Sequence, residues 1–277
     1  MSLIRNGIDQ VFVSLTRRNS YYYSDRLRGI YVEKGIKRNA NKFLFILSPP
    51  YCGSTLLNEI LSTSENVSCN NREGTREGQQ LPSVKDIMFN HDRKWDESFD
   101  YDWEMIKREW MQYWDLSAPV LLEKSPPNII RARSINKYFT PAFFIVFYRN
   151  PYAQAESLIR RKSWMPDKAA QFAIRCLKYQ KSNIQSFHRA VSLSYEELTE
   201  NPLQAKELLV KFLPELADIS IDLEFDAHNF KNKSMGITNL NDEKVKCLTK
   251  IEFDAINSVF KRNVDTLSFF NYQLVEL

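Results

Sequence analysis

The sequence predicts an α/β domain built on a central parallel sheet flanked by helices. Apolar runs of strand length alternate with segments of helical periodicity along residues 42–213, and this alternation is typical of parallel sheets. The run 140–148 is apolar almost throughout, as expected of a strand that is buried on both faces. With 277 residues, 43% of them apolar, the chain can bury the core of one large domain, and we assign residues 42–277 to it.

Residues 1–41 are predicted to form a basic, helical N-terminal extension that packs on the domain. Residues 1–42 carry nine Lys/Arg and three Asp/Glu, net +6, so the rest of the chain carries net −2 (+4 − 6). Weak contact with a membrane surface, or with a partner, is the alternative role of this extension. The overall net charge of +4 is too small to indicate a nucleic-acid partner.

Residues 42–61 are predicted to form a strand, a tight loop and the start of a helix. The apolar run from Lys42 stops at Ser48, and helical spacing resumes after Gly53. Ser54 and Thr55 then place hydroxyls and backbone N–H groups at the positive end of the helix dipole, where phosphate or sulfate binds. The loop lacks the Walker A lysine and the chain has no GxGxxG, so neither a conventional ATPase or kinase nor a dinucleotide-binding fold is indicated.

The remaining elements alternate in the same way. Gly74 and Gly78 mark the polar segment 71–80 as a loop of defined shape. The tryptophans of 95–114 are interpreted as buried aromatics of a peripheral helix, in preference to a platform for a ligand. We expect further strands at 66–70, from 119, at 140–148 and at 190–195, helices at 103–114, 128–139, from 151, at 166–188, 201–212 and 242–260, irregular structure at 214–240, and an apolar tail, 267–277, that packs on the domain.

Several polar groups are predicted to meet at the carboxyl edge of the sheet, where ligands of such sheets bind. They follow successive strands, at 48–55, 123–125, 149 and 195. Ser157 lies two helical turns beyond Arg149, so the guanidinium and the hydroxyl are expected to grip one phosphate together. Arg161, one turn further on, adds positive charge on the same side.

No metal site is predicted. The four cysteines are widely spaced, without a CxxC pair or a histidine-rich neighbourhood. This spacing favours a reduced, intracellular setting, and since the N-terminal residues contain no signal-peptide pattern we expect the protein in the cytoplasm. Cys52 lies in the anion loop without an identifiable base partner, so it is interpreted as a small loop residue and not as a nucleophile.

Five motifs, in order, resemble those of sulfotransferases. The segment Ser48–Leu57 resembles their 5′-phosphosulfate loop, and Tyr148–Ser157 is similar to their 3′-phosphate motif. The other three resemble segments of the tyrosylprotein sulfotransferase branch and its bacterial relatives. These are its catalytic-glutamate loop, its active-site lysine loop and its cofactor-contacting tyrosine segment, at Glu73–Arg76, Glu123–Pro126 and Ser194–Leu198. The resemblance covers about residues 42–213 and implies the P-loop-like sulfotransferase fold.

The resemblance implies that the protein binds PAPS, 3′-phosphoadenosine 5′-phosphosulfate, releases adenosine 3′,5′-bisphosphate and needs no metal. It implies Glu73 as general base, with Glu77 in reserve, and Lys124 as the cation that stabilises the sulfuryl oxygens and the departing phosphate. The expected cofactor-binding residues are Tyr51, Cys52, Gly53, Ser54 and Thr55 at the 5′ end, Arg149, Ser157 and Arg161 at the 3′-phosphate, Tyr195 along the nucleotide, and Lys233, with Lys231 as the alternative, closing over the 3′-phosphate.

Tyr51 is the clear departure from the family loop, which normally has Lys or Arg at this position. Two alternatives stay open. The first is a nucleotide-dependent phosphotransferase that uses the same strand, loop and helix, and the second is a non-catalytic, degenerate sulfotransferase fold used for binding. For an enzyme, the expected acceptor is a hydroxyl of a small molecule, a lipid or a glycan; the sequence indicates neither its identity nor the oligomeric state.

Overall fold

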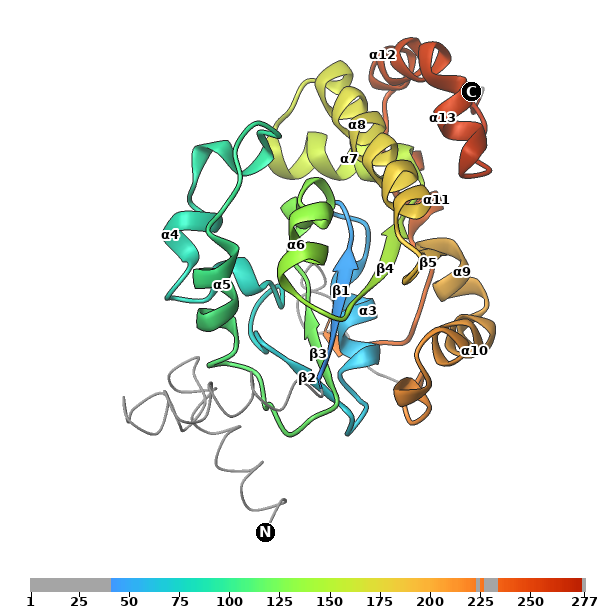
Figure 1. The fold of residues 1–277 in the computed structure, drawn as a ribbon. Helices are drawn as coiled ribbons and strands as arrows, with labels where there is room; N and C mark the ends of the chain where they lie inside the picture. Colours follow the sequence, from blue (N-terminus) through green and yellow to red (C-terminus); the bar gives the residue numbers. More distant parts are fainter. Residues whose placement is uncertain (1–40, 223–224, 227–233, 276–277) are drawn as a thin grey trace.

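A parallel sheet forms the centre of the protein (Figure 1). The computed structural model describes residues 41–222, 225–226 and 234–275. Within these residues the central sheet has the order β2-β3-β1-β4-β5, and every neighbouring pair of strands is parallel. The strands lie within a few residues of the predicted ones, which confirms the α/β class. They are β1 (Lys42–Leu47), β2 (Val67–Cys69), β3 (Val120–Glu123), β4 (Ala142–Tyr148) and β5 (Ala190–Ser194).

Helices follow the strands along the chain. Asn150 begins α7 as predicted, because its Oδ1 accepts the N–H of Tyr152 at 2.9 Å and Pro151 takes the first helical position. A second, two-stranded sheet is formed by the antiparallel pair β6 (Phe225–Asp226) and β7 (Ser234–Met235). The described helices are α3 (Ser54–Leu61), α4 (Lys85–Met88), α5 (Trp103–Trp110), α6 (Ala132–Tyr138), α7 (Pro151–Lys162), α8 (Pro166–Ser186), α9 (Tyr195–Glu200), α10 (Pro202–Phe212), α11 (Asn241–Lys246), α12 (Lys250–Phe260) and α13 (Val264–Phe269).

Side chains of each strand alternate between the two faces of the sheet, and helices bury both. On β1, Phe43 and Phe45 pack on the side of α5, α6 and α8, whereas Leu44 and Ile46 pack on the side of α3, α9 and α10. The first cluster also buries three tryptophans, which confirms their interpretation as core aromatics: Trp103, Trp110 and Trp114. Trp95 is only half-buried.

Two differences from the prediction have a signal in the sequence. The chain turns directly from β5 into α9, where Ser194 and Glu197 form a capping box, so Tyr195 begins a helix and does not end a strand. The helix predicted at 242–260 is two helices, because Thr249 and Glu252 form a second capping box that starts α12. Both boxes follow the S/T-x-x-E pattern, which local periodicity alone overlooks.

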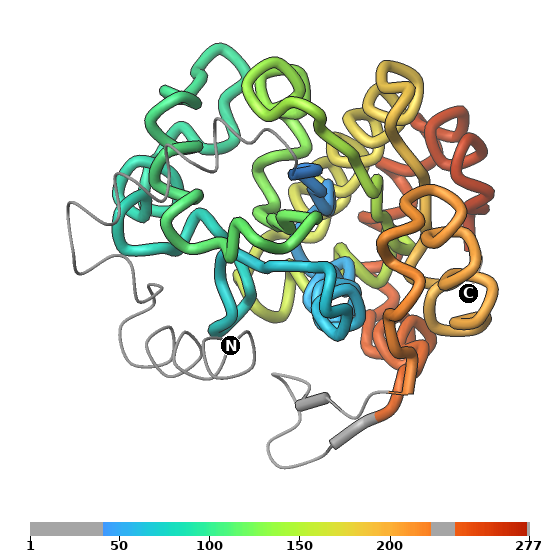
Figure 2. Tube along the Cα trace, turned by 60° about the horizontal axis from the view of Figure 1, so that its bottom comes forward, coloured from blue at the N-terminus to red at the C-terminus, as the bar shows by residue number. Residues whose placement is uncertain are grey.

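The C-terminal tail packs on the domain as predicted, with Leu267 and Phe270 buried beside α7, α8 and α12. The C-terminal helices and the segments around α4 and α5 lie on opposite sides of the molecule (Figures 1 and 2). The predicted extension 1–41 falls, except for Asn41, outside the described residues. No helix in the described ranges has the length and apolar character needed to cross a membrane.

Candidate active site

A cavity of about 660 Å³ opens at the carboxyl edge of the sheet. Its walls come from the loop after β1, the segment 75–95, the loop after β3, helix α7 and the segment 236–244. Most of the predicted site residues line it, as the position of the strand ends requires. These are Tyr51, Gly53, Ser54, Thr55, Lys124, Arg149, Ser157, Arg161 and Tyr195.

Gly53 shapes the loop at the start of α3. Its φ of +85° lies in the left-handed region, and a Cβ at this position would lie 2.5 Å from the Tyr195 ring, so no larger residue fits. No side chain in the described part of the chain caps α3 at Gly53. The N-terminal turn of this helix therefore faces the cavity with its N–H groups and the hydroxyls of Ser54 and Thr55, which suits an anion.

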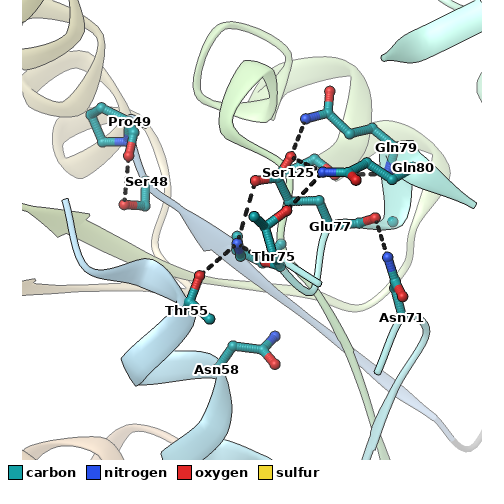
Figure 3. Close-up of polar contacts among 12 residues, drawn as sticks. Ser48, Pro49, Thr55, Asn58, Asn71, Thr75, Glu77, Gln79, Gln80 and Ser125 are labelled. Atoms are coloured by element: carbon teal, nitrogen blue, oxygen red, sulfur yellow. Dashed lines mark hydrogen bonds and ion pairs between the residues drawn. The ribbon is translucent and has the colours of Figure 1, made fainter. Parts of the chain in front are cut away.

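Lys124 is a fully buried cation beside this helix start, with 1% of its surface exposed. Its Nζ lies 3.4 Å from Thr55 Oγ1 and 3.6 Å from Glu77 Oε1, and it donates to the Thr75 carbonyl. Burial lowers the pKa of Lys124, and the nearby Glu77 carboxylate opposes this shift. In Figure 3, Thr75 lies between Glu77 and Thr55, which is at the start of α3.

The two candidate bases, Glu73 and Glu77, differ in position. Glu77 lines the cavity, and its Oε2 accepts hydrogen bonds from the side-chain amides of Gln79 at 2.5 Å and Gln80 at 3.1 Å. Glu73 is partly exposed and is not among the described residues that line the cavity. The carboxylate next to Lys124 is thus that of Glu77, the reserve base in the sequence prediction, and not that of Glu73.

Buried Glu123 holds the turn that carries Glu77. Its Oε1 accepts the N–H of Gly78 at 3.1 Å and the Ser125 hydroxyl at 2.5 Å, and Oε2 accepts the Asn128 amide at 2.5 Å. A Cβ on Gly78 would lie 2.7 Å from Glu123 Oε1, so this turn also requires glycine. Burial raises the pKa of Glu123 to about 8, because a fully buried carboxylate loses its hydration.

The free energy of unfolding is expected to fall between about pH 5 and pH 8 relative to that of a Glu123→Gln variant. The pKa of Glu123 is about 8 in the folded protein and near 4.5 in the unfolded chain. The native state therefore binds more protons than the unfolded state in this pH range, and rising pH favours unfolding. Urea unfolding of both proteins at pH 5 and pH 8 measures the difference. A stability difference that is the same at both values of pH would contradict a raised pKa at Glu123.

Arg149 lies at the end of β4, as predicted, and is fixed on three sides. Its Nε donates to Asn241 Oδ1 at 2.7 Å, its Nη1 donates to the Tyr51 carbonyl at 3.3 Å, and its guanidinium carbon lies 4.0 Å from the Tyr195 ring centroid. Its Nη2 is buried without a hydrogen-bond partner among the described residues. A buried, unpaired guanidinium nitrogen on the cavity wall fits an anionic ligand.

Tyr51 occupies the loop position where the resemblance predicts a basic residue. Its φ of 66° is left-handed, and its ring lies 5.8 Å from the guanidinium carbon of Arg161 on α7. Arg161 therefore brings a positive charge to the place where the loop itself has none. Cys52 is buried and is not among the described cavity-lining residues, and burial raises the pKa of its thiol, in keeping with a small loop residue.

The C-terminal segment contributes to the cavity through residues that the sequence did not single out. Gly236, Thr238, Leu240 and Lys244 line it, and the Tyr195 hydroxyl donates to the Thr238 carbonyl at 2.8 Å. The predicted closing residue Lys233, and its alternative Lys231, lie outside the described residues. Other cavity residues missing from the prediction are Gln79, Gln80, Phe89, Lys94, Trp95, Lys162, Trp164 and Phe172.

The sulfotransferase family model matches residues 44–216, which contain the sheet and most of the cavity. The chain belongs to the sulfotransferase family. Its membership confirms the resemblance at the level of the family, whereas the likeness to the tyrosylprotein branch stays a prediction. No cluster of three or more metal-ligating His, Cys, Asp or Glu side chains occurs within residues 41–222, 225–226 and 234–275.

Solved structures of other sulfotransferases resemble this sulfotransferase at low sequence identity. Sulfotransferase STF9 of Mycobacterium avium is 13% identical, with a TM-score of 0.47, over 89% of this chain and 82% of that one. Sulfotransferase STF1 of Mycobacterium tuberculosis is 9% identical, with a TM-score of 0.46, over 93% of this chain and 97% of that one. A search of curated proteins gives no match.

Proposed function

We propose that this sulfotransferase moves the sulfuryl group of PAPS to a hydroxyl of a small-molecule, lipid or glycan acceptor in the cytoplasm. The main observation in support of this proposal is that two buried cations line one cavity. Arg149 presents its unpartnered Nη2 before α7, and Lys124 lies beside the start of α3. Two separate anion sites suit a nucleotide that carries phosphate groups at both ends.

The described residues fit PAPS as the donor. The loop at Gly53 and the first turn of α3 would hold the 5′-phosphosulfate, Arg149 and Ser157 the 3′-phosphate, and Tyr195 the nucleoside. When bound, PAPS supplies an activated sulfuryl group whose bond to a 5′-phosphate oxygen breaks on transfer. The cavity also contains Arg161, which supplies the charge that Tyr51 lacks.

Glu77 is the general base of the proposed reaction. It accepts the proton of the acceptor hydroxyl, because it is the acidic side chain among the described cavity residues and two glutamine amides hold one of its oxygens in place. Lys124 and the N–H groups at the start of α3 stabilise the negative charge that develops on the sulfuryl and leaving oxygens. In this proposal Glu77 replaces Glu73, which the resemblance implied.

Titration with nucleotides tests the donor. We expect adenosine 3′,5′-bisphosphate to bind about 10- to 100-fold more tightly than adenosine 5′-phosphate, since the 3′-phosphate gains a charge-assisted pair with Arg149. An Arg149→Ala variant should lose this preference and keep its affinity for the monophosphate. Calorimetry measures both affinities. Tighter binding of ATP than of the bisphosphate would favour the phosphotransferase alternative and show that the proposed donor is wrong.

A second experiment identifies the acceptor. A metabolite extract incubated with the protein and sulfur-labelled PAPS should yield a labelled product whose chemistry names the acceptor. If the bisphosphate binds and no extract yields a labelled product, the non-catalytic alternative is correct and the enzymatic proposal is wrong.

A further inference from the structure

The cavity extends well beyond the residues assigned to the donor. Arg149 lies just before Asn150, the N-cap residue of α7, and Lys162 is the last residue of this helix, yet both line the same cavity. Twelve helical residues at about 1.5 Å each span about 18 Å, and the cavity follows this helix to its last turn. Residues of the segment 89–95 also line the cavity. This segment follows α4, on the side of the molecule opposite the C-terminal helices (Figures 1 and 2).

Four aromatic side chains form a wall at this far end, which we call the aromatic wall: Phe89, Trp95, Trp164 and Phe172. The rings of Trp95 and Trp164 meet the Phe172 ring edge to face, with centroids 5.0 Å and 5.3 Å apart. All four side chains are half-buried, so each ring keeps part of its surface exposed. Half-exposed rings from three separate segments provide a slot for a flat apolar group.

Two lysines accompany the aromatic wall. Lys94 Nζ donates to the Phe89 carbonyl at 2.6 Å and lies 4.7 Å from the Phe89 ring centroid, while Lys162 is exposed at the end of α7. In the part of the chain that the structure describes, no carboxylate pairs with either ammonium group within 4 Å. Lys94, Lys162 and Glu77 line the same cavity, and the charges of Lys162, Glu77 and Asp92 all act on the Lys94 ammonium group.

Two neighbouring ammonium groups repel each other, and a bound anion relieves the repulsion. Burial lowers the pKa of Lys94 and the Lys162 charge lowers it further, while the Glu77 and Asp92 carboxylates oppose this shift. The proposed donor places its anionic groups at Arg149, Arg161 and the start of α3, and leaves Lys94 and Lys162 without an anion. The far end therefore combines an apolar slot, unpaired positive charge and the proximity of the base Glu77.

We propose that this end of the cavity is the acceptor site, and that it selects a flat, ring-containing alcohol or phenol that carries an anionic substituent. The inference rests on the proposed function, since it assumes that a hydroxyl acceptor reaches Glu77. The aromatic wall holds the ring, Lys94 and Lys162 pair with the anion, and the hydroxyl faces Glu77. Neutral and cationic compounds of the same shape are disfavoured because the lysines then stay unpaired.

A matched pair of probes tests the inference: 3-(4-hydroxyphenyl)propanoate and 3-(4-hydroxyphenyl)propan-1-ol. Binding is measured by calorimetry and tryptophan fluorescence, with the donor site saturated by adenosine 3′,5′-bisphosphate. We expect the propanoate to bind at least about tenfold more tightly, the gain of one charge-assisted hydrogen bond. Lys94→Gln and Lys162→Gln should each remove most of this preference and leave the affinity for the alcohol within about twofold.

Two further variants complete the design. Trp95→Ala should weaken both probes equally, and Lys181→Gln, on α8 beside the Phe269 ring, should change neither affinity. Equal affinities of the two probes, no binding by either, or an equal loss for both probes in Lys94→Gln would overturn the inference. If the bisphosphate binds and the probes are not distinguished, this inference alone is wrong; if the bisphosphate fails to bind, the proposed function is wrong whatever the probes do.

Discussion

A Lys124→Met variant is expected to lose about a thousandfold in sulfuryl transfer, but only about tenfold in affinity for adenosine 3′,5′-bisphosphate, whose 5′-phosphate loses one charge-assisted contact. The ammonium group lies 3.4 Å from Thr55 Oγ1 at the start of α3, where charge develops on the transferred group. Removing a preorganised donor from such a site typically costs a hundredfold to a thousandfold. Methionine keeps the length of the chain and tolerates the buried position.

Binding of the bisphosphate separates a lost cation from a disturbed fold, since Arg149, Ser157 and the Gly53 loop stay in place. Lys42→Met is the matched control. This variant removes the ion pair between Lys42 and Glu215. Lys42 is at the amino end of β1, at the edge of the sheet opposite the cavity, so sulfuryl transfer should be unchanged. Transfer of labelled sulfate to the identified acceptor measures the rate. A Lys124→Met rate within tenfold of the wild type would remove Lys124 from the catalytic role.

The fold was predictable because its three central strands, β1, β3 and β4, are largely buried on both faces. Each of them reads as an apolar run, and the burial of every described residue of β1 after Phe43, at 0% exposure, accounts for that pattern. Parallel order then brings the strand ends to one edge, which predicted the convergence of Lys124, Arg149 and Tyr195. The helices α9 and α12 were placed less well, since their start is set by capping boxes and not by periodicity.

The site was predictable where one local motif carries the function. The role of Gly53 can be predicted without knowing the fold, because a short anion-binding loop before a helix is a local sequence pattern. The far end of the cavity was not predictable in this way. Lys94 lies far in the sequence from Trp164 and Phe172, and only packing brings them together. Arg161 was predicted as a site residue at the 3′-phosphate, but its place beside the ring of Tyr51, more than a hundred residues away along the chain, was not.

The choice between the two loop carboxylates was open for the same reason. Glu73 and Glu77 lie four residues apart in a segment without periodicity, so the sequence does not reveal which one faces the cavity. The structure separates them through contacts from other strands. Glu123 fixes the N–H of Gly78, and Ser125 fixes that of Gln79, so that Glu77 is held against Lys124.

A Glu77→Gln variant is therefore expected to lose a hundredfold to ten-thousandfold in transfer, the range for removal of a general base. Glu73→Gln, the matched control in the same loop, should stay within about threefold of the wild type. Glutamine keeps the shape of the side chain and can still form hydrogen bonds with the polar groups around Lys124. Adenosine 3′,5′-bisphosphate should therefore bind both variants with the wild-type affinity. The rate of labelled-sulfate transfer decides between them. The reverse order of effects, with Glu73→Gln the slower variant, would restore Glu73 as the base and assign Glu77 to holding Lys124 in place.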